Sequence, residues 1–423
     1  MKESLEISKR GALMPESPIR KLAPLAYKAE DKGVKIYRLN IGQPDLPTPQ
    51  KALDILKNID RKTLEYSPSQ GYSSLRQALV GYYERYQIKL NADEIIITSG
   101  GSEAVLFAFM SCLNPGDEII VPEPAYANYM SFAVSAGAVI RTVTTTIEEG
   151  FCLPKVEMFE ELINERTKAI LICNPNNPTG YLYTQKEMYQ IRNLVKKYNL
   201  YLFSDEVYRE FIYTGSPYIS AMHLDGIEQN VILIDSVSKR YSECGIRIGA
   251  LITKNENVRK TVMKFCQARL SPPLIGQIIA EASIEGTESY SREVYEEYLD
   301  RRKCLIDGVN RIHGCYSPIP MGAFYTVAQL PVDDAERFCA WCLEKFIWHD
   351  KETPDYTWVG EHKLPCVGES IMMAPAQGFY TTPGIGKNQV RLAYVLCKHD
   401  IQRSLFLLEK ALSEYNKLDK YNE

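Results

Sequence analysis

A lysine with two serines before it and an arginine after it marks the stretch where chemistry is most readily expected. Val231–Ile234 is a short, apolar, β-branched run, typical of a strand buried on both faces. A polar turn with Ser236, Ser238 and Lys239 follows, and Arg247 stands eight residues beyond the lysine. A partly desolvated lysine favours the neutral amine that forms imines, and hydroxyls beside a guanidinium hold phosphates. The stretch predicts an imine-forming lysine beside a phosphate site; the alternative is a loop lysine and a surface arginine.

Four further apolar runs end in turns with polar or aromatic residues. The runs, each expected to be a strand, span residues 94–98, 118–121, 168–173 and 200–203. The turn residues are Gly101 with Ser102, Tyr126, Asn177, and Asp205 with Tyr208. Ligands of mostly parallel sheets bind at the carboxyl ends of the strands, so we expect these residues and Lys239 to share one site.

Each of these turns is a weak signal when taken alone. A diglycine before a helix is common, although Gly101 would bare backbone N–H groups to an anion and Ser102 is a candidate N-cap. Tyr126 alone is equally compatible with a core or surface tyrosine. Gly42, in a Gly/Pro turn, belongs either to a linker or to backbone that approaches a ligand closely.

Composition narrows the class of protein. The chain has 423 residues, 45% hydrophobic and 24% charged, as in soluble globular proteins, with a net charge of −4. We expect no nucleic acid, because no basic stripe is present, and no membrane, because no apolar run is long enough to span one. The expected location is cytoplasmic.

The two cysteines Cys339 and Cys342 fall within a helical pattern, which favours a buried helix face over a redox or metal site. No metal site is expected.

Strands that alternate with helices between residues 94 and 253 predict an α/β fold with a mostly parallel sheet. Residues 1–45 are expected to be irregular. The helices expected in the large domain span residues 51–58, 75–86, 104–113, 185–197 and 256–267.

A long amphipathic helix expected at residues 290–312 leads into a smaller domain. The last strand expected in the smaller domain spans residues 389–395. Successive side chains of a strand point to opposite faces, and this alternation could aim Arg391 into a cleft. The other elements expected in this domain are strands at 323–327 and 370–373 and helices at 335–346 and 401–415, with a surface excursion at 347–366.

Three segments, in this order and spacing, resemble class I/II aminotransferases, the aspartate aminotransferase-like enzymes of fold type I that use pyridoxal 5'-phosphate (PLP). They are NPNNPTG at residues 174–180, SDEVY at 204–208 and SxSK…R at 236–247. The resemblance covers roughly residues 20–415. It implies a PLP-dependent transferase fold with a large α/β/α domain at residues 46–300 and a small α+β domain built from residues 1–45 and 301–423.

The resemblance also implies a role for each turn residue. Lys239 would carry PLP as an internal aldimine, and Asp205 would pair with the pyridine nitrogen. Asn177 and Tyr208 would bond the phenolic oxygen of the ring, and Tyr126 would stack on it. The residues implied around the phosphate are Gly101, Ser102, Ser236, Ser238 and Arg247, with Tyr66 reaching in from the partner of a homodimer.

The implied reaction moves an amino group between an L-amino acid and a 2-oxo acid, with 2-oxoglutarate as the expected acceptor. Gly42, Asn177 and Arg391 would bind the α-carboxylate of the substrate. A guanidinium offers a carboxylate a fixed two-pronged match, and an ionised acid at the ring nitrogen lets the ring absorb a carbanion. The lysine, once released by the substrate, would move the proton.

Two questions stay open at this point. A PLP-dependent lyase or synthase, of the C–S β-lyase or aminocyclopropane-carboxylate synthase type, is the alternative reaction, because Lys239 and Asp205 would serve it equally. Acidic-substrate members of one subgroup carry a lysine where this chain has Ser102, so the amino donor is not determined. Arg269 is a candidate for a distal carboxylate, with a surface arginine at a helix end as the alternative.

Overall fold

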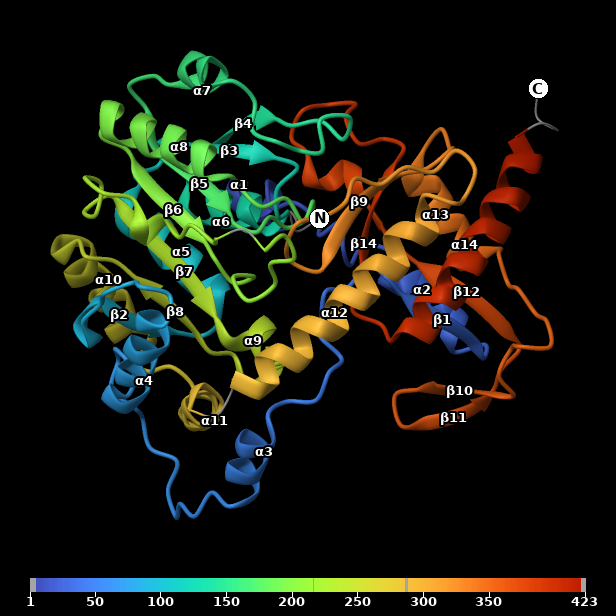
Figure 1. Ribbon diagram of the computed structural model, residues 1–423, viewed down its shortest axis with the longest axis horizontal. Helices are drawn as coiled ribbons and strands as arrows, with labels where there is room; N and C mark the ends of the chain where they lie inside the picture. The colour runs from blue at the N-terminus through green and yellow to red at the C-terminus, as the bar shows by residue number, and fades with distance from the viewer. Residues whose placement is uncertain (1–4, 216, 286–287, 420–423) are drawn as a thin grey trace.

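A seven-stranded sheet forms the centre of the larger of two lobes (Figure 1). The computed structural model describes residues 5–215, 217–285 and 288–419. The strands are β2 (Ile95–Thr98), β3 (Glu118–Glu123), β4 (Val139–Thr144), β5 (Thr167–Cys173), β6 (Tyr201–Asp205), β7 (Val231–Ser236) and β8 (Gly249–Ile252). Their order is β2-β8-β7-β6-β5-β3-β4, and β8 runs antiparallel to both of its neighbours while the other pairs are parallel.

The interior strands are apolar throughout because helices cover both faces of the sheet. In β5, Ala169 and Leu171 pack into one core cluster, whereas Ile170 and Ile172 pack into another on the opposite face. The first cluster includes α5 (Gly101–Cys112), α6 (Asn128–Ala136) and α10 (Glu256–Arg269). The opposite face packs against α4 (Ser73–Glu84), α7 (Val156–Leu162), α8 (Gln185–Tyr198) and α11 (Leu274–Ile284). This layering confirms the predicted α/β fold class.

Local signals fix the ends of α8. The Thr184 hydroxyl accepts from the Glu187 backbone N–H, and the Glu187 carboxylate accepts from the Thr184 backbone N–H at 2.7 Å, which is a capping box. Asn199 ends the helix in the left-handed conformation, with φ +50°. The helix therefore starts and stops where its sequence provides partners for the unpaired backbone groups.

The smaller lobe joins segments from both ends of the chain. β1 (Val34–Arg38) pairs in parallel with β12 (Gly368–Met372), and β14 (Gln389–Ala393) lies antiparallel between β13 (Ala374–Pro375) and β9 (Tyr325–Gln329). The long helix α12 (Glu288–Val309) runs from the larger lobe along the smaller one (Figure 1). The remaining helices of this lobe are α2 (Ala23–Glu30), α13 (Ala335–Glu344) and α14 (Lys398–Asp419).

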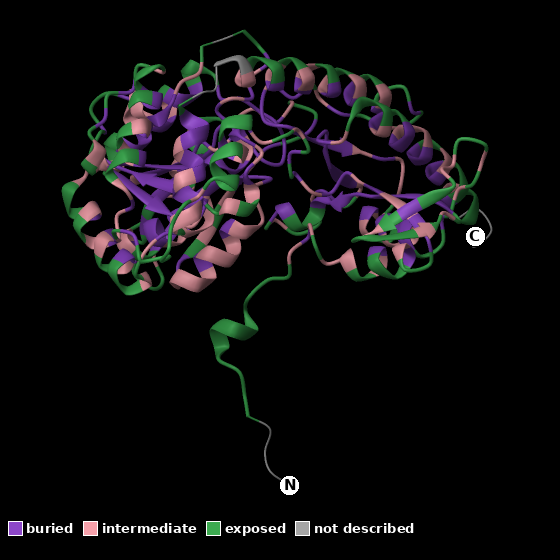
Figure 2. Ribbon diagram, turned by 90° about the horizontal axis from the view of Figure 1, so that it is seen from below, coloured by how far each residue is buried: buried purple, intermediate pink, exposed green. Residues whose placement is uncertain are grey.

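The prediction that residues 1–45 are irregular is wrong, since they contain α1 (Lys9–Ala12), α2 and β1. β1 receives its ladder hydrogen bonds from β12, whose position far along the chain no local pattern reveals. The segment around α1 is exposed and stands away from the body of the molecule (Figure 2).

The predicted excursion at residues 347–366 contains the hairpin of β10 (Tyr356–Val359) and β11 (His362–Pro365). α3 (Gln50–Lys57) lies where a helix was expected.

Cys339 and Cys342 are both buried on α13, as the helical pattern predicts. Among the described residues, none of the helices combines the length and the apolar composition that a membrane span requires.

Candidate active site

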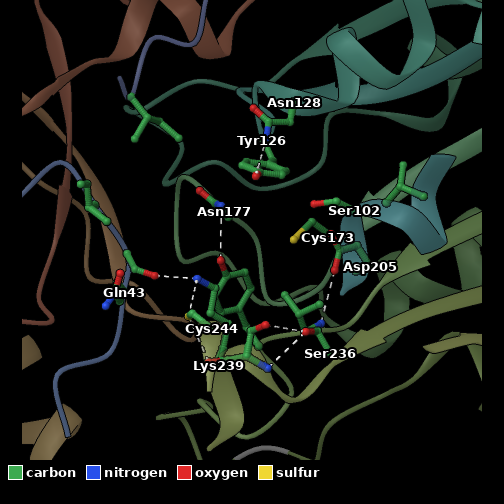
Figure 3. A pocket seen from close by; sticks show the side chains of 18 of the residues that line it. Gln43, Ser102, Tyr126, Asn128, Cys173, Asn177, Asp205, Ser236, Lys239 and Cys244 are labelled. Atoms are coloured by element: carbon green, nitrogen blue, oxygen red, sulfur yellow. Dashed lines mark hydrogen bonds between the residues drawn. The ribbon is translucent and has the colours of Figure 1, made fainter. Parts of the chain in front are cut away.

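One cavity of about 710 Å³ lies at the carboxyl edge of the large sheet, against β9 and β14 of the smaller lobe. Its size is that of a site for a cofactor and a small substrate. Figure 3 shows four of the polar residues, Asn177, Asp205, Ser236 and Lys239, around it. The predicted site residues that line it are Gly42, Gly101, Ser102, Tyr126, Asn177, Asp205, Tyr208, Ser236, Ser238, Lys239, Arg247 and Arg391. Tyr66 does not line it, and its side chain is 77% exposed.

Lys239 projects from α9 (Val237–Arg240), which starts directly at the end of β7. The helix begins there because the Ser236 hydroxyl accepts from the Ser238 backbone N–H. The Lys239 amine donates to the Gly42 carbonyl at 2.7 Å and lies 3.7 Å from the Cys244 sulfur. The amine is thus only partly buried and held at the cavity by one strong backbone contact.

Asp205 is the last residue of β6 and is buried. Tyr129, on α6, donates its hydroxyl to Asp205 Oδ2 at 2.6 Å, and the Val207 backbone N–H donates to Oδ1 at 3.3 Å. Burial raises the pKa of Asp205 to about 6 despite these donors. A cation placed against this carboxylate would lower that pKa, so the site favours a positively charged partner.

Arg391 is the opposite case, a guanidinium only 1% exposed that faces no carboxylate among the described residues. It donates to Asn177 Oδ1 at 3.1 Å and to the Asn40 carbonyl, and its Nε has no hydrogen-bond partner. Burial lowers its pKa. A buried cation with donors to spare calls for an anion, and the cavity is where that anion would bind.

Asn177 and Tyr208 lie next to each other on the same wall. The Asn177 amide donates to the Tyr208 hydroxyl at 3.4 Å, and that hydroxyl lies 3.1 Å from the hydroxyl of Tyr325. Tyr126 lies nearby, where its hydroxyl accepts from Asn128 at 2.8 Å. These are hydrogen-bonding groups of neutral side chains around a partly apolar pocket, which suits an aromatic ligand.

The N-terminus of α5 faces the cavity through Gly101 and Ser102. Ser102 is the second residue of the helix and not its cap, which corrects that expectation; Gly100 occupies the cap position with φ +79°. A Cβ at Gly100 would lie 2.4 Å from the Arg247 guanidinium, so the glycine lets this arginine approach the helix start. Helix N–H groups, the Ser236 hydroxyl and a guanidinium form a donor set for an anion.

Arg269 is not part of the cavity. It pairs with Glu103 at 2.7 Å and donates to the Ser69 carbonyl at 3.1 Å, with a side chain only 15% exposed. It ends α10, as the alternative expected, but its guanidinium is largely buried and engaged, so it is not free to bind a substrate in this cavity. Its role is to hold the Glu103 carboxylate in the first turn of α5.

The lining residues that were not anticipated include Arg20, Tyr129, Cys244 and Tyr325. Tyr129 belongs to α6, which the sequence pattern did not reveal, and Arg20 belongs to the segment expected to be irregular. Tyr325 starts β9, where alternation with the buried Phe324 could have suggested an inward side chain. The described residues contain no group of three His, Cys, Asp or Glu side chains that could hold a metal ion.

Comparison with known proteins agrees with this geometry. The family model for aminotransferase class I and II matches residues 34–354. Aspartate aminotransferase of Pyrococcus horikoshii is 29% identical over 418 residues, which cover 96% of this chain and 97% of that protein. Aspartate aminotransferase of Thermotoga maritima is 31% identical over 335 residues, covering 78% of this chain and 87% of that protein.

Solved structures are similar as well. Alanine aminotransferase from Pyrococcus furiosus superposes with a TM-score of 0.84 at 28% identity, covering 97% of this chain and 100% of that one. The predicted resemblance and fold type are confirmed, and of the two predicted reactions the matches support amino transfer. The chain belongs to the aminotransferase class I and II family and is a transaminase.

Proposed function

We propose that this transaminase holds PLP in the described cavity and moves an amino group between an L-amino acid and a 2-oxo acid, with 2-oxoglutarate as acceptor. One observation carries the proposal: a buried carboxylate, Asp205, and a buried guanidinium, Arg391, line the same cavity and neither faces an opposite charge there. A cationic ring and a substrate carboxylate would satisfy both. When bound, PLP supplies an electron sink for the carbanion formed at the substrate Cα.

Asp205 and Lys239 carry the catalytic roles in this proposal. Asp205 holds the proton on the ring nitrogen, and that positive charge removes the cost of burying the carboxylate. In the free enzyme the Lys239 amine donates to the Gly42 carbonyl. Once the substrate has released it, the neutral amine would take the proton from the substrate Cα as general base and, as an ammonium group, deliver it to C4′ of the cofactor as general acid. Tyr208 and Asn177 donate to the phenolic oxygen of the cofactor ring.

The remaining residues bind and orient. The N-terminus of α5 with Gly101 and Ser102, together with Ser236, Ser238 and Arg247, holds the phosphate. Tyr126 stacks on the ring. Arg391 binds the α-carboxylate in two-pronged fashion, with Asn177 and the backbone of Gly42 beside it.

A homodimer with shared sites belongs to the same proposal. Tyr66 lies on an exposed segment together with Leu64, whose side chain is 67% exposed, and these apolar surfaces support a contact with a second subunit. We further propose that both chain ends form the small domain, at residues 1–45 and 301–423, which the pairing of β1 with β12 supports. The cytoplasmic location stays a prediction.

The test is covalent capture of the cofactor. After incubation with PLP and reduction with borohydride, the label should be on the peptide that contains Lys239, and Lys239→Ala should take up none. Lys254→Ala, which removes a lysine outside the cavity, is the matched control and should be labelled like the wild type. Wild-type enzyme loaded with an amino acid should regain its original absorbance when 2-oxoglutarate is added. A label on another lysine would contradict the proposal.

A further inference from the structure

Four charged side chains are buried next to the carboxyl ends of β6 and β7 without lining the cavity. They are Glu206, Arg209, Asp235 and Arg240, and each side chain is at most 2% exposed. Two of the charges are negative and two are positive, so the group as a whole is neutral. These charges leave none over for a ligand, and their burial needs a reason other than binding.

The four side chains form a chain in which neighbours have opposite charges. Glu206 Oε2 lies 3.1 Å from Arg209 Nη2, and Arg209 Nη1 lies 3.9 Å from Asp235 Oδ2. The same Asp235 oxygen lies 2.7 Å from Arg240 Nη2. Because each member contacts the next, a displacement of one changes the electrostatic energy of its neighbour.

The two ends of this charge chain lie beside the two residues that are expected to react. Glu206 directly follows Asp205, and Arg240 directly follows Lys239. The Glu206 backbone N–H also donates to the Ile234 carbonyl of β7 at 2.9 Å. The charge chain therefore connects the turn after β6 with the short helix α9, which starts at the end of β7.

Both carboxylates of the charge chain are attached to the backbone as well. Glu206 Oε1 accepts from the Ser220 hydroxyl at 2.9 Å and from the Ala221 backbone N–H at 2.8 Å. Asp235 Oδ1 accepts from the Ser236 backbone N–H at 2.8 Å. The positions of these side chains are thus coupled to the backbone around them.

Two tyrosines of α4 cover the arginines of the charge chain. The Arg240 guanidinium lies 4.0 Å from the centroid of the Tyr82 ring, and that of Arg209 lies 4.7 Å from the centroid of the Tyr83 ring. Both tyrosines are buried. Since they keep water away, the four charges interact more strongly than they would at the surface.

Stability alone does not account for this arrangement. Apolar side chains of similar volume often stabilise a protein as well as a buried ion pair does, or better. Arg240 Nη1 has no hydrogen-bond partner among the described residues, which adds a further cost. What directional contacts provide in addition is one defined placement of the groups at their ends.

We propose that the charge chain sets the position of Lys239 relative to Asp205, and that Glu206 and Arg240 are positioning residues for amino transfer. The inference rests on the proposed function, in which Asp205 faces the ring nitrogen and Lys239 moves the proton. Proton transfer requires alignment of the amine with the bound substrate, and a misplacement on the order of 1 Å can cost about 10²-fold in rate.

The test removes one charge from each end of the charge chain. Glu206→Gln removes a negative charge, and Arg240→Met removes a positive one. A direct effect of these charges on the site would change kcat in opposite directions, whereas a lost placement lowers kcat in both variants. We expect kcat to fall about tenfold or more in each, with KM within about twofold of the wild-type value.

Circular dichroism of the absorption band of bound PLP provides a readout besides activity, because it depends on how the protein orients the ring. Its amplitude per bound PLP should change in Glu206→Gln and in Arg240→Met. Arg240→Lys should restore the amplitude and most of kcat, since one guanidinium nitrogen makes both contacts with Asp235.

Glu369→Gln is the matched control. It removes a fully buried carboxylate that pairs with Arg403 in the smaller lobe, away from the cavity, and should leave kcat and the dichroism of bound PLP unchanged. If Arg240→Met does not fold, Asp235→Asn combined with Arg240→Gln takes its place, because it removes both charges of that pair together.

Three results would overturn the inference: changes of kcat in opposite directions, an unchanged kcat and dichroism in either variant, or an equal loss in Glu369→Gln. The first would show a direct charge effect, and the third a general effect of lost stability. Borohydride labelling of Lys239 in the wild type does not depend on these variants, so it separates these failures from a failure of the proposed function.

Discussion

Arg240, the residue after Lys239, forms a buried ion pair with Asp235 in which one guanidinium nitrogen contacts both carboxylate oxygens. Arg240 Nη2 lies 2.8 Å and 2.7 Å from the two carboxylate oxygens, and both side chains are almost fully buried. Burial alone would raise the pKa of Asp235, but the charges of Arg240 and Arg209 outweigh it and hold the pKa below its ordinary value. Tyr83 donates a further hydrogen bond to the same carboxylate at 2.5 Å. This buried ion pair therefore fixes the backbone of α9, the short helix that carries Lys239.

Removing one partner of this pair should cost much of the stability. Arg240→Met leaves Asp235 buried without its closest cation, and we expect a loss of about 3–5 kcal/mol in the free energy of unfolding. Urea denaturation followed by circular dichroism would measure it. Arg192→Met, which removes a more exposed ion pair with Asp225, should cost under about 1 kcal/mol. Equal losses in the two variants would show that the buried pair contributes no more to the free energy of unfolding than the exposed pair.

Asp205→Asn should preserve folding but slow the reaction. The substitution keeps the size of the side chain and removes the charge that would hold the ring nitrogen protonated, so amino transfer should fall by about 10²–10³-fold. Stopped-flow absorbance of the half-reaction would give the rate. Asp225→Asn is a surface control and should react like wild type. A wild-type rate in Asp205→Asn would make that residue structural.

Arg391→Lys should weaken every substrate alike. Lysine keeps the charge but not the fixed fork, and the lost hydrogen bond should lower kcat/KM about tenfold or more for each amino acid and each 2-oxo acid. The rank order of substrates should stay the same. If only one substrate were affected, Arg391 would read a side chain instead of the α-carboxylate.

Mixed dimers test whether Tyr66 acts across a subunit interface. If Tyr66→Phe and Lys239→Ala homodimers are each inactive, mixing them should restore part of the activity, because one site of the hybrid would carry neither change. Activity should be measured after subunit exchange has been verified by mass spectrometry. Exchange without recovery would place Tyr66 in the site of its own chain or outside any site.

Glu243 should make stability depend on pH. Burial raises its pKa to about 8, above the ordinary value of about 4.3, so between these values the folded protein keeps a proton that the unfolded chain loses. The free energy of unfolding should therefore fall as pH rises through this window. Glu243→Gln cannot titrate, and should be more stable than wild type at pH 8 and similar near pH 4.5.

Melting temperatures at both pH values would show this difference. Glu344→Gln, on the exposed side of α13, should follow the wild type. A Glu243→Gln profile as steep as that of wild type would mean that another group causes the slope.

The site was largely predictable because its residues follow strands. Gly101, Asn177, Asp205 and Lys239 each come just after an apolar run, and parallel pairing brings the ends of such runs to one edge. The type of these residues and their positions after the strands were therefore enough to predict that they lie together, and all four line one cavity. β8, which runs against its neighbours, does not disturb that edge.

Residues whose position depends on remote contacts were not predictable. Arg20 is brought to the cavity by Asn40, and Arg269 is removed from it by Glu103. Neither partner can be deduced from sequence separation or periodicity. α6, which carries Tyr129, was missed because it is short and its apolar residues fall on most faces of the helix, so no helical periodicity stands out.

The pairing of β1 with β12 also constrains how the enzyme is made. A ribosome releases Val34–Arg38 long before Gly368–Met372, so the earlier strand emerges with no partner for its backbone groups. Asn40 follows β1 directly, and its contact with Arg391 forms only after that late residue has emerged. During synthesis the contact between Asn40 and Arg391 therefore forms late, and a nascent chain that ends before Arg391 lacks it.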